Sequence, residues 1–113
     1  MFMKNTVSIK ENHEFKRIYY KGKSVCTPVV VLYYRKNNLT FNRLGLTATK
    51  KIGTAVCRNR ARRVLRQAYR ELEPFLKTGY DFILVARTKT PFVKTQAVKQ
   101  ALEECFAGRE MLK

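Results

Sequence analysis

The feature that most restricts how this chain can fold is a stretch of 56 residues, 15–70, without a single Asp or Glu. The same stretch carries 15 of the 24 Lys and Arg residues, and the 113-residue chain has a formal net charge of +16. Charge of one sign repels itself and destabilises a compact state, so these cations suit a surface that meets an external polyanion. The sequence pI near 10.2 indicates nucleic acid as that partner.

An anionic membrane surface is the rival partner for a basic chain. However, no apolar run approaches the roughly 18 residues that a membrane span requires, and residues 1–5 lack the continuous apolar segment of a signal peptide. We therefore expect a cytoplasmic protein with no membrane partner. The length and the 45% content of hydrophobic residues predict a single folded domain over residues 1–113.

Residues 54–73 predict the best-defined helix of the chain. Thr54 can cap its start, and Pro74 follows its end. Apolar residues recur at spacings of three and four and form one stripe that can pack on a sheet: Cys57, Ala61, Val64, Leu65, Ala68 and Leu72. The opposite side and its flanks carry a different set: Arg58, Asn59, Arg60, Arg62, Arg63, Arg66 and Arg70.

This basic face predicts phosphate binding. Like charges four residues apart, such as Arg62 and Arg66, destabilise an isolated helix by about 0.2–0.5 kcal/mol per pair, so an external partner should offset the cost. A merely solvated helix face normally mixes Glu with Lys and Arg. In addition, the planar guanidinium group of arginine can bind two phosphate oxygens at once or stack on a base.

The remaining sequence alternates between helical and strand patterns. Residues 10–21 predict a first helix, and residues 29–34, 43–49 and 80–86 predict strands, the first two of which we expect to pair as a hairpin. Pro91 can open a last helix. The order is αβββαβα, or αββαβα if residues 24–27 form no strand. We expect an α+β domain in which helices pack on a mixed four-stranded sheet.

Two segments of this chain resemble the signature of the bacterial ribonuclease P protein subunit. They are Lys-Lys-Ile-Gly at 50–53 and Arg-Asn-Arg-Ala-Arg-Arg-Val-Leu-Arg-Gln-Ala-Tyr at 58–69. Residues 15–22, 43–46 and 83–87 resemble other segments of that family, so the likeness covers nearly the whole chain. Thr54 stands where some relatives have Asn, a change that keeps a capping oxygen.

The resemblance implies both a fold and a function. It implies a left-handed crossover around the Arg-Asn-Arg helix, although about 98% of such crossovers are right-handed. It also implies a protein that joins a catalytic RNA to remove the 5′ leader of precursor tRNA, with no obligate protein partner. The basic helix, together with Lys50 and Lys51, would contact the catalytic RNA.

A cleft between the first helix and the sheet would hold the single-stranded leader, according to the same resemblance. Phe15 and Tyr19 are one helical turn apart, and Tyr33 shares a strand face with Val31, so the three rings could form a stacking platform for unpaired bases. By resemblance, Thr47 lines the same groove. Plain core or sheet positions are the alternative for all of these residues, although tyrosine hydroxyls prefer a wet boundary.

No set of titratable residues in the sequence suggests that the protein itself cuts RNA. The only histidine, His13, has no evident partner, and the eight acidic residues form no obvious pair on one face. Cys26, Cys57 and Cys105 lack the spacing of a metal site. We expect no catalytic or metal site in the protein, with Mg²⁺ held by the RNA. The alternative function is a structural RNA-binding protein of the same fold, such as a ribosomal protein or an RNA chaperone.

Overall fold

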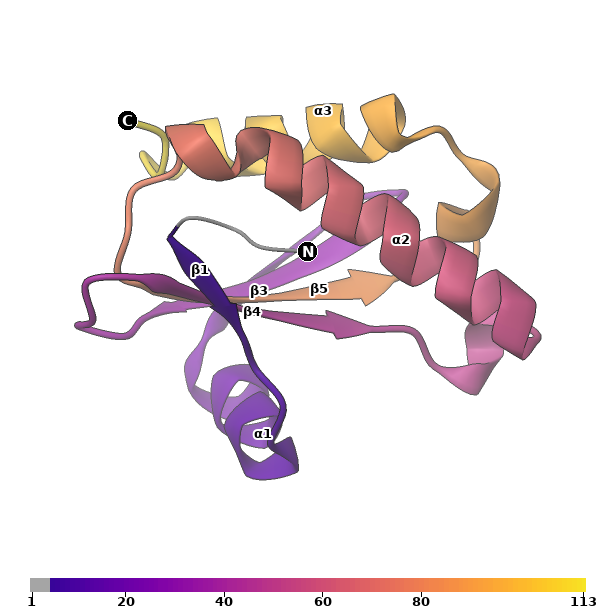
Figure 1. Ribbon diagram of the computed structural model, residues 1–113, viewed down its shortest axis with the longest axis horizontal. Helices are drawn as coiled ribbons and strands as arrows, with labels where there is room; N and C mark the ends of the chain where they lie inside the picture. The colour runs from indigo at the N-terminus through magenta and orange to yellow at the C-terminus, as the bar shows by residue number, and fades with distance from the viewer. Residues whose placement is uncertain (1–4) are drawn as a thin grey trace.

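A five-stranded mixed sheet separates two helical layers in the computed structural model, which describes residues 5–113 (Figure 1). The helices α2 (Ala55–Leu72) and α3 (Thr95–Ala107) lie together on one face of the sheet, and α1 (Asn12–Lys21) covers the other. The spatial order of the strands is β1-β4-β5-β3-β2. Their bounds are β1 Thr6–Ser8, β2 Lys23–Cys26, β3 Val30–Lys36, β4 Asn42–Thr47 and β5 Tyr80–Ala86.

The predicted order αβββαβα is confirmed, with one strand added in front of it. Residues 23–26 form β2, which decides between the two orders that the sequence left open. The prediction of a four-stranded sheet is wrong by that additional strand, β1, which pairs in parallel with β4. With only three residues, β1 is too short for an alternating pattern to reveal it.

The predicted hairpin between residues 29–34 and 43–49 is wrong. β5 lies between β3 and β4, antiparallel to the first and parallel to the second. The physical reason is burial: Phe82, Ile83 and Leu84 in β5 are completely inaccessible, and only a central strand can cover successive side chains on both faces. The turn after β3 therefore leads to β4, which does not pair with β3.

The unit formed by β4, α2 and β5 is a left-handed crossover. In Figure 1 both strands point to the right, β4 lies nearer the viewer than β5, and α2 lies above them. Seen from the helix side with the strands pointing up, β5 is therefore to the left of β4. This hand agrees with the family resemblance and opposes the usual preference of such units.

Two apolar clusters hold the three layers together. The larger lies between the sheet and the pair α2 and α3, and it buries Leu65, Tyr69 and Phe106 completely. The smaller lies under α1 and is built on Ile18 and Ile83. Because the predicted apolar stripe of α2 is used in the larger cluster, most arginines of this helix are directed away from the sheet. None of the helices in the described part of the chain has the length and apolar character needed to span a membrane.

Candidate RNA-binding surfaces

The basic face of α2 lies on the outer side of the molecule. The hydroxyl of Thr54 accepts a hydrogen bond from the backbone N–H of Cys57 at 3.3 Å, which confirms the predicted cap. Arg58 and Arg62 are half-buried, and the other residues predicted for this surface are exposed: Lys50, Lys51, Asn59, Arg60, Arg63, Arg66 and Arg70. Lys50 and Lys51 occupy the 3-10 turn η1 (Lys50–Ile52) just before the helix.

An open groove of about 680 Å³ runs along this face toward the start of α3. Arg60, Arg63 and Arg66 line it from α2, and Thr95 lines it from α3. No carboxylate is among the lining residues. Three guanidinium groups along one concave surface raise the local concentration of polyanions, so the groove suits a chain of phosphates.

Arg62 differs from the other arginines because it also has partners within the protein. Its Nη1 donates to Oδ1 of Asn59 at 3.2 Å, and its Nη2 donates to the carbonyl oxygen of Ala48 at 3.4 Å. These contacts hold the guanidinium between α2 and the end of β4. Arg62 is therefore placed by the fold, whereas Arg63 and Arg66 have their side chains in solvent.

The aromatic residues predicted to bind the leader are brought together under α1. The ring of Tyr19 meets the ring of Tyr33 edge-on, with centroids 4.7 Å apart, and Phe15 lies 6.4 Å from Tyr19. The hydroxyls of Tyr19 and Thr47 share a hydrogen bond of 3.2 Å. Tyr19 is 37% exposed, and Phe15, Tyr33 and Thr47 are half-buried, so the cluster is accessible from outside.

An open pocket of about 400 Å³ adjoins these rings, between α1 and the end of β4. Phe15, Tyr19 and Thr47 line it, and the cations Lys16 and Arg62 lie at the same pocket. Tyr33 does not line this pocket but supports it through Tyr19. The half-buried Val31 shares the sheet face of Tyr33 and pairs with Val85, and it does not line the pocket either.

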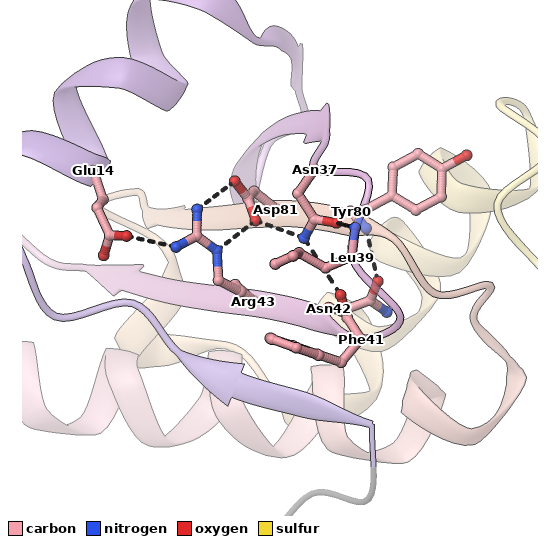
Figure 2. Close-up of polar contacts among 8 residues, drawn as sticks. All are labelled: Glu14, Asn37, Leu39, Phe41, Asn42, Arg43, Tyr80 and Asp81. Carbon is pink, nitrogen blue, oxygen red and sulfur yellow. Dashed lines mark hydrogen bonds and ion pairs between the residues drawn. The ribbon is translucent and has the colours of Figure 1, made fainter.

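A polar network that the sequence did not predict holds α1 against the sheet (Figure 2). Arg43 of β4 donates from Nε and Nη2 to the two carboxylate oxygens of Asp81, each at 2.8 Å. Its Nη1 forms an ion pair with Glu14 of α1. Asn37 donates a further hydrogen bond of 2.8 Å to Asp81. Because Glu14 precedes Phe15, this network fixes α1 close to the aromatic pocket.

The charges in this network shift the pKa of Asp81. Burial disfavours the ionised carboxylate, but hydrogen bonds from Arg43 and Asn37 outweigh burial and keep the pKa of Asp81 below its usual value. The hydrogen bond to Asp81 is also the main reason why the pKa of Arg43 is raised. Both groups are therefore charged at neutral pH, and the pair acts as a fixed support beneath α1.

The family model for ribonuclease P matches residues 3–109. The chain belongs to the ribonuclease P protein family. A ribonuclease P protein component of Thermoanaerobacter sp. (strain X514) is 45% identical over 110 residues, which cover 92% of this chain and 95% of the relative. Both the sequence-based resemblance and the interpretation of this chain as a subunit of the endoribonuclease ribonuclease P are thereby confirmed.

Solved structures agree with this assignment. The RNase P protein of Staphylococcus aureus superposes with a TM-score of 0.80 at 31% identity, covering 94% of this chain and 97% of that protein. The RNase P protein of Thermotoga maritima gives a TM-score of 0.77 at 26% identity, covering 87% and 93%. Nothing in these comparisons favours the alternative of a ribosomal protein or RNA chaperone.

Several acidic residues of this chain have structural partners. Asp81 binds Arg43, Glu73 accepts hydrogen bonds from the backbone N–H of Asn5 and the hydroxyl of Thr6, and Glu71 pairs with Lys99. Within residues 5–113, no three His, Cys, Asp or Glu side chains form a group that could hold a metal ion.

Proposed function

We propose that this ribonuclease P protein binds the catalytic RNA through the basic face of α2 and the 5′ leader of precursor tRNA through the aromatic pocket under α1. The observation that carries this proposal is the presence of two chemically different surfaces: one suits phosphates, and the other suits unpaired bases. A protein that positions a folded RNA and a single-stranded RNA segment needs both kinds of surface. We expect it to act in the cytoplasm.

The basic face supports the contact with the catalytic RNA. Exposed guanidinium groups on one helix can each donate paired hydrogen bonds to phosphate oxygens, and their planar shape reduces the side-chain freedom lost per hydrogen bond. Neutralising phosphates also releases condensed counterions, which makes such binding strong at low salt. Lys50 and Lys51 extend the positive charge beyond the start of α2.

The aromatic pocket supports the contact with the leader. Stacking of a base on an aromatic ring requires an unpaired base, so the rings of Phe15 and Tyr19, with Tyr33 supporting Tyr19, select single-stranded RNA. Lys16 and Arg62 at the same pocket can neutralise the phosphates that connect the stacked bases. A mature tRNA, which has lost its leader, would not use this pocket.

We assign the cleavage chemistry to the catalytic RNA, which would also hold Mg²⁺. Three carboxylates are bound to partners within the protein: Asp81 to Arg43, Glu73 to Thr6 and Glu71 to Lys99. His13 is exposed on α1. The contribution of the protein is to bind and orient the RNA partners, since holding reactants in a productive geometry lowers the barrier of a reaction.

Reconstitution tests this proposal. The protein is mixed with the ribonuclease P RNA of the same organism and a precursor tRNA at low Mg²⁺, and release of the leader is followed on a gel. We expect cleavage when protein and RNA are both present, little with RNA alone, and none with the protein alone. Efficient cleavage by protein free of RNA would contradict the assignment of the chemistry to the RNA.

A further inference from the structure

A second basic pocket lies at the other end of the strands from the aromatic pocket. The aromatic pocket is next to the end of β4, whereas this one is next to the start of β5 and the end of β3. It has a volume of about 480 Å³, and no Asp or Glu lines it. Five cations do: Lys21, Lys23, Arg35, Lys36 and Arg109.

The register of the sheet explains why cations and tyrosines meet there. Lys23 of β2 pairs with Tyr34 of β3, and Lys36 of β3 pairs with Tyr80 of β5. Paired residues on neighbouring strands point to the same face, and so do residues two apart on one strand. The four side chains therefore share the sheet face on which α3 packs. Because α3 ends at Ala107, it leaves this corner of the sheet open.

Arg109, just beyond α3, is held in place with hydrogen-bonding capacity to spare. Its Nε donates to the hydroxyl of Tyr34 at 3.2 Å, and its Nη1 donates to the carbonyl oxygen of Cys105 at 3.1 Å. Its guanidinium carbon lies 5.9 Å from the ring centroid of Tyr34. A guanidinium has five N–H groups, so three remain for a ligand such as a phosphate oxygen.

Tyr80 offers an aromatic surface at the same pocket. Its ring is half-exposed, stacks on Phe82 with centroids 5.7 Å apart, and extends away from the Arg43–Asp81 network in Figure 2. Its backbone N–H donates to Oδ1 of the buried Asn42 at 2.9 Å, which fixes the start of β5. The ring is therefore supported by Phe82 and lines the pocket.

We propose that this corner pocket binds one nucleotide of single-stranded RNA, with the phosphate on Arg109, Lys23 and Lys36 and the base on the ring of Tyr80. Cations in a pocket that no acidic residue lines select a polyanion, and an adjacent aromatic ring distinguishes RNA from an acidic polypeptide because a base can stack on it. This site is separate from the two surfaces of the proposed function. A test can therefore disprove the corner pocket without disproving the proposed function, and the reverse also holds.

Nuclear magnetic resonance titration of the full chain separates the three surfaces, because each backbone amide reports on its own surroundings. The probe is single-stranded oligoadenylate, and polyglutamate is the control polyanion. The titration uses the double variant Arg63→Ala, Arg66→Ala, so that the basic face contributes little. We expect saturable shifts of the amides of Lys23, Lys36 and Arg109 with oligoadenylate. An equal response to polyglutamate would contradict RNA as the ligand, and no response of these amides would overturn the site.

Further substitutions in that double variant test the two parts of the pocket. Lys23→Gln with Lys36→Gln should weaken binding at these amides about fivefold, the loss expected for two exposed ionic contacts. Tyr80→Leu keeps apolar bulk and should weaken it about fivefold or more through lost stacking, with folding checked by thermal unfolding. The matched control is Lys10→Gln with Lys89→Gln, two exposed cations outside the pocket. A loss of the same size in this control would overturn the proposal.

Discussion

The ring of Phe15 lies directly against the backbone of Gly45. A Cβ atom added at Gly45 would be 2.6 Å from Cε1 and 2.7 Å from Cζ of that ring, closer than real Cβ contacts come. Gly45 sits in β4 opposite Ile83 of β5, under the middle of the small apolar cluster. The aromatic pocket therefore depends on the absence of a side chain in the strand beneath it.

We predict that Gly45→Ala displaces Phe15 and damages the leader site. Overpacking of this kind typically costs about 1–3 kcal/mol of the free energy of unfolding. The holoenzyme should bind precursor tRNA several-fold more weakly and mature tRNA as before, as measured by direct binding of both. Thermal unfolding of Gly45→Ala measures separately how much stability the variant loses. Unchanged binding of precursor tRNA would show that the position of Phe15 is irrelevant to the leader.

Tyr33→Leu tests the stacking platform without adding volume. Leucine keeps an apolar side chain against Ile18 and Ile83 but removes the aromatic ring that contacts the ring of Tyr19. Because Tyr33 holds the ring of Tyr19 in place, and stacking on such a ring contributes about 1–3 kcal/mol per base, precursor tRNA should bind the holoenzyme several-fold more weakly. Affinity for mature tRNA and for the catalytic RNA alone should stay near wild type. Equal losses for precursor and mature tRNA would make Tyr33 a core residue.

The sequence predicted the elements of the fold better than their pairing. The helix α2 was predictable because its cap, its apolar stripe and its basic face are local properties of consecutive residues. The position of β5 between β3 and β4 was not, because it follows from burying Phe82 and Ile83 on opposite faces, a demand of the whole sheet. The left-handed crossover came from family resemblance, and local patterns would have favoured the other hand.

For the binding surfaces, the sequence predicted side chains that present charge or an aromatic ring and missed those that position them. Gly45 has no side chain that a sequence pattern could mark, and the space it leaves for the ring of Phe15 is visible only in the structure. The pair of Arg43 with Asp81 joins residues far apart in the chain, which a pattern search cannot connect. Val31 and Tyr33 were predicted for the leader site, and neither lines the aromatic pocket, because that pocket is next to the end of β4 and both residues lie on β3.

The ion pair of Arg43 with Asp81 beneath α1 should contribute less to the stability of the protein at acid pH. The folded-state pKa of Asp81 is below its value of about 3.9 in an unfolded chain, so its contribution to stability is complete above that value and is lost as the pH falls through the folded-state pKa. Asp81→Asn should cost about 3 kcal/mol at pH 7, since it leaves Arg43 without its main partner. Denaturant unfolding should show the two proteins converging below about pH 4. A pH-independent difference would contradict this role of Asp81.

His13→Ala should leave reconstituted cleavage close to wild type. His13 is the only histidine of the chain, is exposed on α1, and does not line the aromatic pocket. Single-turnover cleavage of precursor tRNA by the reconstituted holoenzyme measures the effect on the chemical step. A loss of several orders of magnitude in a folded protein would instead assign general acid or base catalysis to this imidazole.

The double variant Arg63→Ala, Arg66→Ala should weaken assembly with the catalytic RNA and make it less dependent on salt. Both side chains are exposed and line the groove of α2, so their loss removes phosphate contacts without removing packing. Each lost contact should flatten the slope of log affinity against log salt by roughly 0.7–0.9. Arg62 is a poorer choice because it also binds Asn59 and Ala48. Lys10→Ala with Lys89→Ala removes the same charge elsewhere and should change the slope little. If the two double variants flatten the slope equally, the effect belongs to net charge and the basic face of α2 is not the binding surface.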